Sequence, residues 1–158
     1  MNNIIQKPYP KIGVNVFVLR DGKILLGKRI GKTGYGTWCL PGGHFEYGES
    51  LAGAAERELE EETSIVSSHL RFLHLVNDPM EHAHYVHIDF IADEWTGEPR
   101  VTEPDKFAEW KFFDLNNLPT EIFIGHQKLI PAFMNSIAFI DSEKGFVRKD
   151  GDVIEFKV

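Results

Sequence analysis

The segment GHFEYGESLAGAAERELEEETSI, residues 43–65, contains a predicted helix that changes in character from one end to the other. Residues 51–63 are mostly strong helix formers and include no proline. Ser50 precedes them directly, and its side-chain oxygen is suited to capping the first turn. The sequence therefore predicts a helix that begins at Leu51 and ends at Thr63.

One face of this helix passes from apolar to acidic. At about 100° per residue, two groups of three side chains share a sector of about 100°. They are Leu51, Ala54 and Ala55 in the early turns, and Glu58, Glu61 and Glu62 in the later ones. Carboxylates gathered in this way repel one another, and a hard divalent cation would relieve the repulsion. Oxygen ligands favour Mg²⁺, Mn²⁺ or Ca²⁺ over Zn²⁺. A solvated acidic helix face would carry the same glutamates, so the helix alone leaves both interpretations open.

The residues around the helix favour the metal site. A glycine, a first glutamate, an Arg-Glu pair and a Glu-Glu pair occupy positions Gly43, Glu49, 57–58 and 61–62. This pattern resembles the Nudix box, and the run WCLPGG at residues 38–43 resembles the strand and turn that enter it. The resemblance implies an α/β protein of the Nudix fold, in which a mixed β-sheet is sandwiched between α-helices.

Ser64 departs from the family pattern, which has glycine at this position. A glycine would end the helix in a left-handed turn, and a serine adopts that conformation at a cost of about 1 kcal/mol. The departure concerns the end of the helix and not the carboxylates upstream.

The resemblance covers approximately residues 12–133. Runs at 26–29, 40–44 and 84–86 resemble the MutT-like branch, and residues 109–114 with Leu118-Pro119 resemble the strand and loop that follow in many members. The resemblance implies that a nucleoside triphosphate is cut to the monophosphate and pyrophosphate by a metal-activated water. A nucleotide sugar or a dinucleotide is the alternative substrate. A different class of protein is a further alternative, namely a nucleotide-binding regulator that has the fold but no catalytic activity. A calcium-binding domain is disfavoured because no twelve-residue loop has alternating Asp and Asn ligands.

The same resemblance gives the glutamates their expected roles. Glu58 and Glu62 are expected to bind Mg²⁺, for which Mn²⁺ is a substitute, and the carbonyl of Gly43 is a further candidate ligand. Glu61 is expected to be a ligand, or to orient or deprotonate the attacking water. The residues expected to hold these carboxylates in place are Glu49 and Arg57.

The resemblance also implies substrate contacts from a second set of residues, namely Arg29, Gly43, His44, His87, Gly125 and His126. Arg29 is a candidate for binding a phosphate, although a solvated charge at the end of a strand is an equal alternative. Alternate residues of a strand face opposite ways, so Tyr85 and His87 share a face and His84 does not. This split argues against a zinc site. His87 and Cys39 differ from the residues expected in a relative that binds a purine base. The identity of the nucleotide base is therefore not predicted.

Hydrophobic patterning predicts the remaining elements. Two strands at 12–19 and 24–27 form a hairpin, and a glycine-rich loop follows at 31–37. Trp38 is expected in the core. The later predictions are strands at 70–76, 83–92 and 109–113, a turn at 77–82, a loop at 96–106, a helix at 127–140 with Pro131 in its first turn, and a hairpin extension at about 146–158 around Asp150-Gly151.

Length and composition limit the class of protein. The chain has 158 residues, 42% of them hydrophobic, which suits a single domain spanning residues 1–158. A formal net charge of −7 argues against binding a nucleic-acid backbone, and a phosphorylated small molecule would need metal ions to bridge it to the protein. The family resemblance implies that this small molecule is a nucleotide. A single cysteine and the absence of a signal-like or membrane-spanning run predict a cytoplasmic protein without a membrane partner. By family resemblance, a homodimer is expected.

Overall fold

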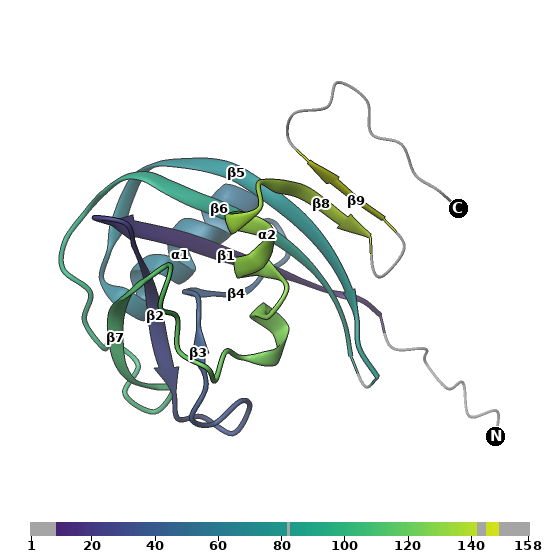
Figure 1. Ribbon diagram of the computed structural model, residues 1–158. Helices are drawn as coiled ribbons and strands as arrows, with labels where there is room; N and C mark the ends of the chain where they lie inside the picture. The colour runs from purple at the N-terminus through teal and green to yellow at the C-terminus, as the bar shows by residue number, and fades with distance from the viewer. Residues whose placement is uncertain (1–8, 82, 142–144, 149–158) are drawn as a thin grey trace, which may run out of the picture.

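The computed structural model describes residues 9–81, 83–141 and 145–148 of the chain. In these residues nine strands form a mixed sheet with helices on both faces (Figure 1). The strands are β1 (Lys11–Arg20), β2 (Lys23–Arg29), β3 (Trp38–Cys39), β4 (Gly42–His44), β5 (Val66–Pro79), β6 (His84–Thr96), β7 (Phe107–Asp114), β8 (Ile137–Asp141) and β9 (Gly145–Arg148). The helical elements are α1 (Leu51–Thr63), the 3₁₀ turn η1 (Ile124–His126) and α2 (Leu129–Met134).

The strand β1 organises the sheet because it has a different neighbour along each part of its length. It runs parallel to β6, with Lys11 opposite Tyr85 and Val18 opposite Ala92. Its first half pairs with β4, and its end forms the predicted hairpin with β2. The sheet continues as β3-β2-β1-β6-β5-β8-β9, and β7 joins β2. The residues that enter α1 are therefore anchored directly to the central strand.

Alternation along β1 divides the interior into two layers. Val14, Val16 and Val18 pack in a buried cluster with Ala54, Ala55 and Leu59 of α1. Phe17 faces the other way, into a cluster with Leu129 and Ile130 of α2. Trp38 also lies in this second cluster, as expected of a core residue. The predicted sandwich of a mixed sheet between helices is confirmed, and Figure 1 shows α1 and α2 on opposite faces.

The helix α1 has the predicted bounds and the predicted ends. The Ser50 side chain accepts a hydrogen bond from the Gly53 amide at 3.0 Å. At the other end, Ser64 is left-handed, with φ 63° and ψ 8°, and its amide donates to the Glu60 carbonyl at 2.9 Å. The backbone thus makes the turn that the family makes with glycine.

The predicted helix at 127–140 is wrong in its second half. The structure has only the short helix α2, with Pro131 in its first turn as expected, and then the strand β8. Ser136 is left-handed with φ 54° and ends the helix. Ile137 and Ile140 belong to β8, which pairs in parallel with β5. Branched and aromatic side chains favour a strand once such a neighbour is present.

The predicted turn at 77–82 is also wrong at its start. The strand β5 extends through this segment to Pro79, and Asn77 and Asp78 pair with Val86 and Tyr85 of β6. The other predicted strands are present with longer bounds. In the tail, β9 pairs antiparallel with β8, while the predicted turn at Asp150-Gly151 lies outside the described residues. No helix in the described part is long and apolar enough to cross a membrane.

Candidate active site

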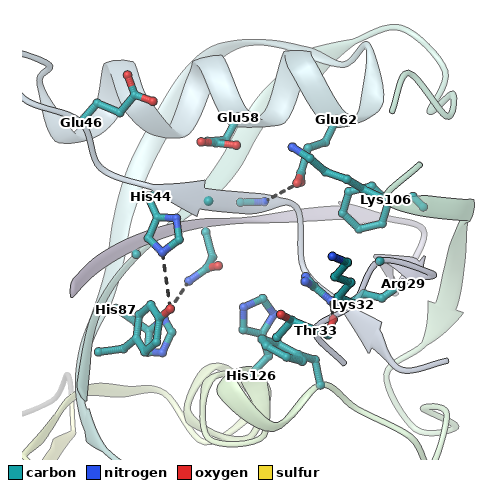
Figure 2. A pocket seen from close by; sticks show the side chains of 18 residues that line it. Arg29, Lys32, Thr33, His44, Glu46, Glu58, Glu62, His87, Lys106 and His126 are labelled. Atoms are coloured by element: carbon teal, nitrogen blue, oxygen red, sulfur yellow. Dashed lines mark hydrogen bonds between the residues drawn. The ribbon is translucent and has the colours of Figure 1, made fainter. Parts of the chain in front are cut away.

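A cavity of about 480 Å³ opens between the end of α1, the strands β1, β4 and β6, and the loops after β2 and before β7. Figure 2 shows the side chains that line it. Most of them fall into three chemical groups, which are the acids Glu46, Glu58 and Glu62, the bases Arg29, Lys32 and Lys106, and the rings of His44, Tyr85, His87, Phe107, Phe123 and His126.

Glu62 is the most deeply buried acid of the cavity, with 4% of its surface exposed. One oxygen accepts a hydrogen bond from the Gly42 amide at 2.9 Å (Figure 2). Within the described ranges, no basic side chain lies within 4.0 Å of it. Burial raises the pKa of Glu62 to about 8, and the neighbouring Glu58 adds to the rise, while the Gly42 hydrogen bond opposes it. A buried carboxylate without a cationic partner is a suitable ligand for a cation from solution.

Glu58 lies one helical turn before Glu62 and lines the same cavity, with its side chain 14% exposed. It packs against the backbone of Gly43 so closely that a Cβ at Gly43 would overlap the Glu58 carboxylate. Any larger residue at this position would therefore displace the Glu58 carboxylate. The two carboxylates and the Gly43 backbone bring oxygen atoms to one wall of the cavity, which suits Mg²⁺ or Mn²⁺.

Arg57 fixes these acids from outside the cavity. Its guanidinium donates to both oxygens of Glu49, at 2.6 and 3.1 Å, and to Glu58 at 2.8 Å. It also reaches Glu61 at 3.1 Å and the His44 carbonyl at 3.3 Å. The hydrogen bond from Arg57 lowers the pKa of Glu49, and the same contact raises the pKa of Arg57. The predicted pairing of Arg57 with the box carboxylates is therefore present.

Glu61 takes a different position from its two neighbours. Its side chain is 55% exposed, engages Arg57, and does not line the cavity. Over the residues that the structure describes, no group of three or more Asp, Glu, His or Cys side chains surrounds a common point. The described site thus offers two carboxylates and backbone oxygen, and Glu61 would have to leave Arg57 to join them.

The bases lie at the end of the cavity away from Glu46 (Figure 2). Arg29 donates from Nε to the Thr33 carbonyl at 2.9 Å, and its guanidinium lies 4.5 Å from the ring centroid of Phe123. Lys28, the preceding residue, instead has its Nζ over the Trp38 ring, 5.1 Å from the centroid. Arg29 therefore faces the cavity, as expected of a phosphate ligand, and Lys28 does not.

Three near-parallel rings form another wall. His44 and Tyr85 have ring centroids 6.0 Å apart, and Tyr85 and His87 have theirs 5.6 Å apart with an interplanar angle of 15°. His126 meets His87 edge to face. Its Nδ1 accepts from the Leu40 amide at 3.0 Å, and burial lowers its pKa well below the usual value, so the neutral ring carries its proton on Nε2. Gly125 is buried but does not line the cavity.

Behind this wall lies a buried polar cluster that the sequence reasoning missed. Asn15 donates to Asp89 at 2.6 Å and approaches Nδ1 of His87 at 3.3 Å. Nε2 of His74 lies 2.7 Å from the other Asp89 oxygen, and both side chains are fully buried. On the far side of His87, Asp78 binds Lys128 at 2.5 Å. The available signal was the polar spacing of His87 and Asp89 on one face of an otherwise apolar strand.

The chain matches a family model described as the NUDIX domain over residues 9–133. It belongs to the Nudix family. An ADP-ribose pyrophosphatase of Methanocaldococcus jannaschii is 38% identical over 128 residues, which are 80% of this chain and 74% of that protein. An oxidized purine nucleoside triphosphate hydrolase of Danio rerio is 33% identical over 110 residues, or 66% of each chain.

A solved structure agrees with this assignment. The MutT Nudix hydrolase from Burkholderia pseudomallei superposes with a TM-score of 0.74 at 32% identity, covering 78% of this chain and 98% of that one. The predicted family and fold are confirmed, and the chain is an enzyme of the Nudix hydrolase class.

Proposed function

We propose that this Nudix hydrolase cuts a nucleoside triphosphate to the monophosphate and pyrophosphate, with Mg²⁺ held by Glu58, Glu62 and the backbone of Gly43. The observation that supports the metal site most strongly is the burial of Glu62 beside Glu58 without a basic partner in the described residues. Glu62, buried beside a second carboxylate, is stabilised as an anion when a cation binds there. Mn²⁺ would bind the same oxygen atoms.

A bound divalent cation supplies an acidified water and neutralises charge on the phosphate chain. The residues of the chain do the rest. Glu58 and Glu62 hold the cation at one wall of the cavity, and Arg57 fixes Glu58 through its own contact with Glu49. Arg29 binds a phosphate at the opposite end. The rings of Tyr85, His87 and His126 exclude water from the side where the nucleoside is bound.

Glu61 has two possible roles in this scheme. After a change of rotamer that releases it from Arg57, it becomes a further ligand. In its present exposed position beside Arg57, it instead orients or deprotonates the attacking water. Measuring metal affinity and turnover of Glu61→Gln separates these roles, because loss of a ligand weakens cation binding strongly, whereas loss of a group that acts on water lowers turnover much more than affinity.

The test of the metal site is the substitution Glu58→Gln, which keeps the size of the side chain and removes its charge. We expect the Mg²⁺-dependent release of pyrophosphate to fall by at least about a thousandfold, since loss of a metal ligand removes most of the charge stabilisation that the site provides. Glu60→Gln is the matched control, because Glu60 lies on the exposed side of the same helix. Undiminished turnover by Glu58→Gln, with an unchanged unfolding temperature, would overturn the metal assignment.

ADP-ribose is a second candidate substrate, favoured by the similarity to the Methanocaldococcus jannaschii pyrophosphatase. A panel of canonical and oxidised nucleoside triphosphates, ADP-ribose, nucleotide sugars and dinucleotides decides between them. The proposal requires the highest kcat/KM for a triphosphate, with pyrophosphate as product. A higher kcat/KM for ADP-ribose than for any triphosphate would show that ADP-ribose is the preferred substrate. Binding of nucleotides without hydrolysis of any would instead support a regulator.

A further inference from the structure

We propose that Arg29, Lys32 and Lys106 form a binding site for the free terminal phosphate of the substrate, and that this site selects a nucleoside triphosphate over a nucleoside diphosphate that ends in a neutral sugar. The inference deepens the proposed function and rests on it. It assigns Lys32 and Lys106, which no sequence pattern singled out, as specificity-determining residues.

The three bases come from two separate parts of the chain that the backbone ties together. Arg29 ends β2 and Lys32 lies in the loop that follows, while Lys106 immediately precedes β7. The amides of Ile30 and Gly31 donate to the Lys106 carbonyl, at 2.8 and 3.4 Å. Figure 2 shows the three side chains at one end of the cavity, opposite His44 and Glu46. Their grouping is therefore a property of the fold and not of a single flexible loop.

The charge of this group is available to a ligand. In the described part of the chain, no carboxylate lies within 4.0 Å of Arg29 or Lys32. The Arg29 guanidinium is already oriented by the Thr33 carbonyl and by the Phe123 ring. Lys106 binds Glu103 at 2.7 Å, and its side chain remains 55% exposed. Arg29, Lys32 and Lys106 thus bring positive charge to one end of the cavity in a chain of net charge −7, and an anionic group of the substrate would find basic partners there.

The position of Lys106 relates this site to the metal site. Lys106 lines the same cavity as Glu58 and Glu62, and the carboxylates of Glu103, Glu62 and Glu58 raise the pKa of Lys106. A phosphate chain that crosses from the Glu58 and Glu62 side to the basic end would have its last phosphate next to Arg29 and Lys32. A terminal phosphate carries up to two negative charges, whereas a terminal ribose carries none. Three bases at that end therefore favour the triphosphate.

Direct binding of inorganic pyrophosphate in the presence of Mg²⁺ provides a test that does not require turnover. We expect the double variant Lys32→Gln/Lys106→Gln to bind pyrophosphate at least tenfold more weakly than the unaltered protein, and AMP within about twofold of it, since AMP has no terminal pyrophosphate. Lys28→Gln is the matched control, because Lys28 lies next to Arg29 but on the opposite face of β2. Equal pyrophosphate binding by all three proteins, or no binding by the unaltered protein, would overturn the inference.

The kinetic test compares two substrates in the same variants. The double variant is expected to raise the KM for a nucleoside triphosphate at least tenfold and to leave kcat/KM for ADP-ribose within about twofold. An equal loss for both substrates would show that these bases bind the phosphates common to both, and the inference would fail while the proposed function stood. If the unaltered protein hydrolyses neither substrate, the proposed function fails, and pyrophosphate binding still decides whether the phosphate site exists.

Discussion

Glu62 illustrates at the scale of one residue how the fold prepares a binding site. The helix α1 places this carboxylate against the Gly42 amide in the interior, where a hydrogen bond only partly offsets the loss of solvation. With a pKa of about 8, Glu62 is mostly protonated at pH 7 when no cation is bound. The residue therefore exchanges a proton for a metal ion.

This exchange can be measured. Binding of Mg²⁺ or Mn²⁺ at pH 7 is expected to release close to one proton, because the metal binds the ionised carboxylate. The released fraction should fall towards zero at pH 9, where Glu62 is ionised before binding. Calorimetry in two buffers of different ionisation enthalpy measures the proton count. Metal binding at pH 7 without proton release would contradict the assignment, and Glu62→Gln should show no release at all.

The same shift makes the stability of the metal-free protein depend on pH. The pKa of Glu62 is higher in the folded state than its ordinary value of 4.5, so the folded state holds a proton that the unfolded state has lost. The free energy of unfolding should therefore decrease as pH rises from about 4.5 to about 8, and then level off as far as Glu62 is concerned. Urea denaturation across this range, compared with Glu62→Gln, isolates the effect. A difference between the two proteins that does not change with pH would contradict it.

Arg57 shows how one side chain can position several others. A lysine at this position keeps the charge but cannot form the fork that reaches Glu49, Glu58 and Glu61 together. Arg57→Lys is expected to lower metal affinity or kcat/KM by about 10- to 100-fold with little loss of folding. Arg71→Lys, at an exposed pair with Asp93, serves as the control and should have no effect. Equal activity of both variants would show that Arg57 is not a positioning residue.

At the scale of elements, the residues at the two ends of α1 determine where the helix begins and ends and contribute to its stability. Ser64 holds a left-handed conformation that glycine adopts without strain. Ser64→Gly is expected to raise the free energy of unfolding by about 0.5–1 kcal/mol, and Ser50→Ala to lower it by about 1 kcal/mol because the Gly53 amide loses its partner. Denaturant unfolding measures both. A destabilised Ser64→Gly protein would mean that the serine side chain contributes more than its backbone strain costs.

Elements with local signals were predictable and those that depend on distant neighbours were not. The helix α1 carries its cap, its helix formers and its apolar stripe within its own residues, so its bounds were correct. Residues 137–141 have spacing that suits a helix, but they form β8 because β5 offers a free edge. Similarly, the strand β5 continues through Asn77 and Asp78 because β6 pairs with them.

The site residues likewise differ in whether the local sequence predicts their positions. Glu58 and Glu62 were predictable because helix periodicity fixes their common direction. Glu61 instead binds Arg57 at the surface, and periodicity does not determine that contact. Lys32 and Lys106 lie 74 residues apart in irregular segments, and only the hydrogen bonds between those segments bring them to one cavity. No sequence pattern at either position indicates this.

At the scale of the whole molecule, buried polar contacts join the sheet to the cavity. Asp89 on β6 contacts Asn15 on β1 and His74 on β5, and Asn15 in turn approaches His87 on the cavity wall. Asp89→Ala would leave two buried polar side chains without this partner and is expected to cost about 2–4 kcal/mol of stability. Asp93→Ala, at an exposed position of the same strand, is the comparison. Equal unfolding midpoints would contradict the role given to Asp89.

The proposed activity of the molecule depends on a cation at the inner end of α1, next to the backbone of Gly43. The most direct measurement is anomalous X-ray diffraction from crystals of the protein grown with Mn²⁺ and pyrophosphate. We expect a Mn²⁺ peak within about 2.0–2.3 Å of carboxylate oxygens from both Glu58 and Glu62. A structure in which Mn²⁺ binds elsewhere, while these two carboxylates contact only protein and water, would contradict it.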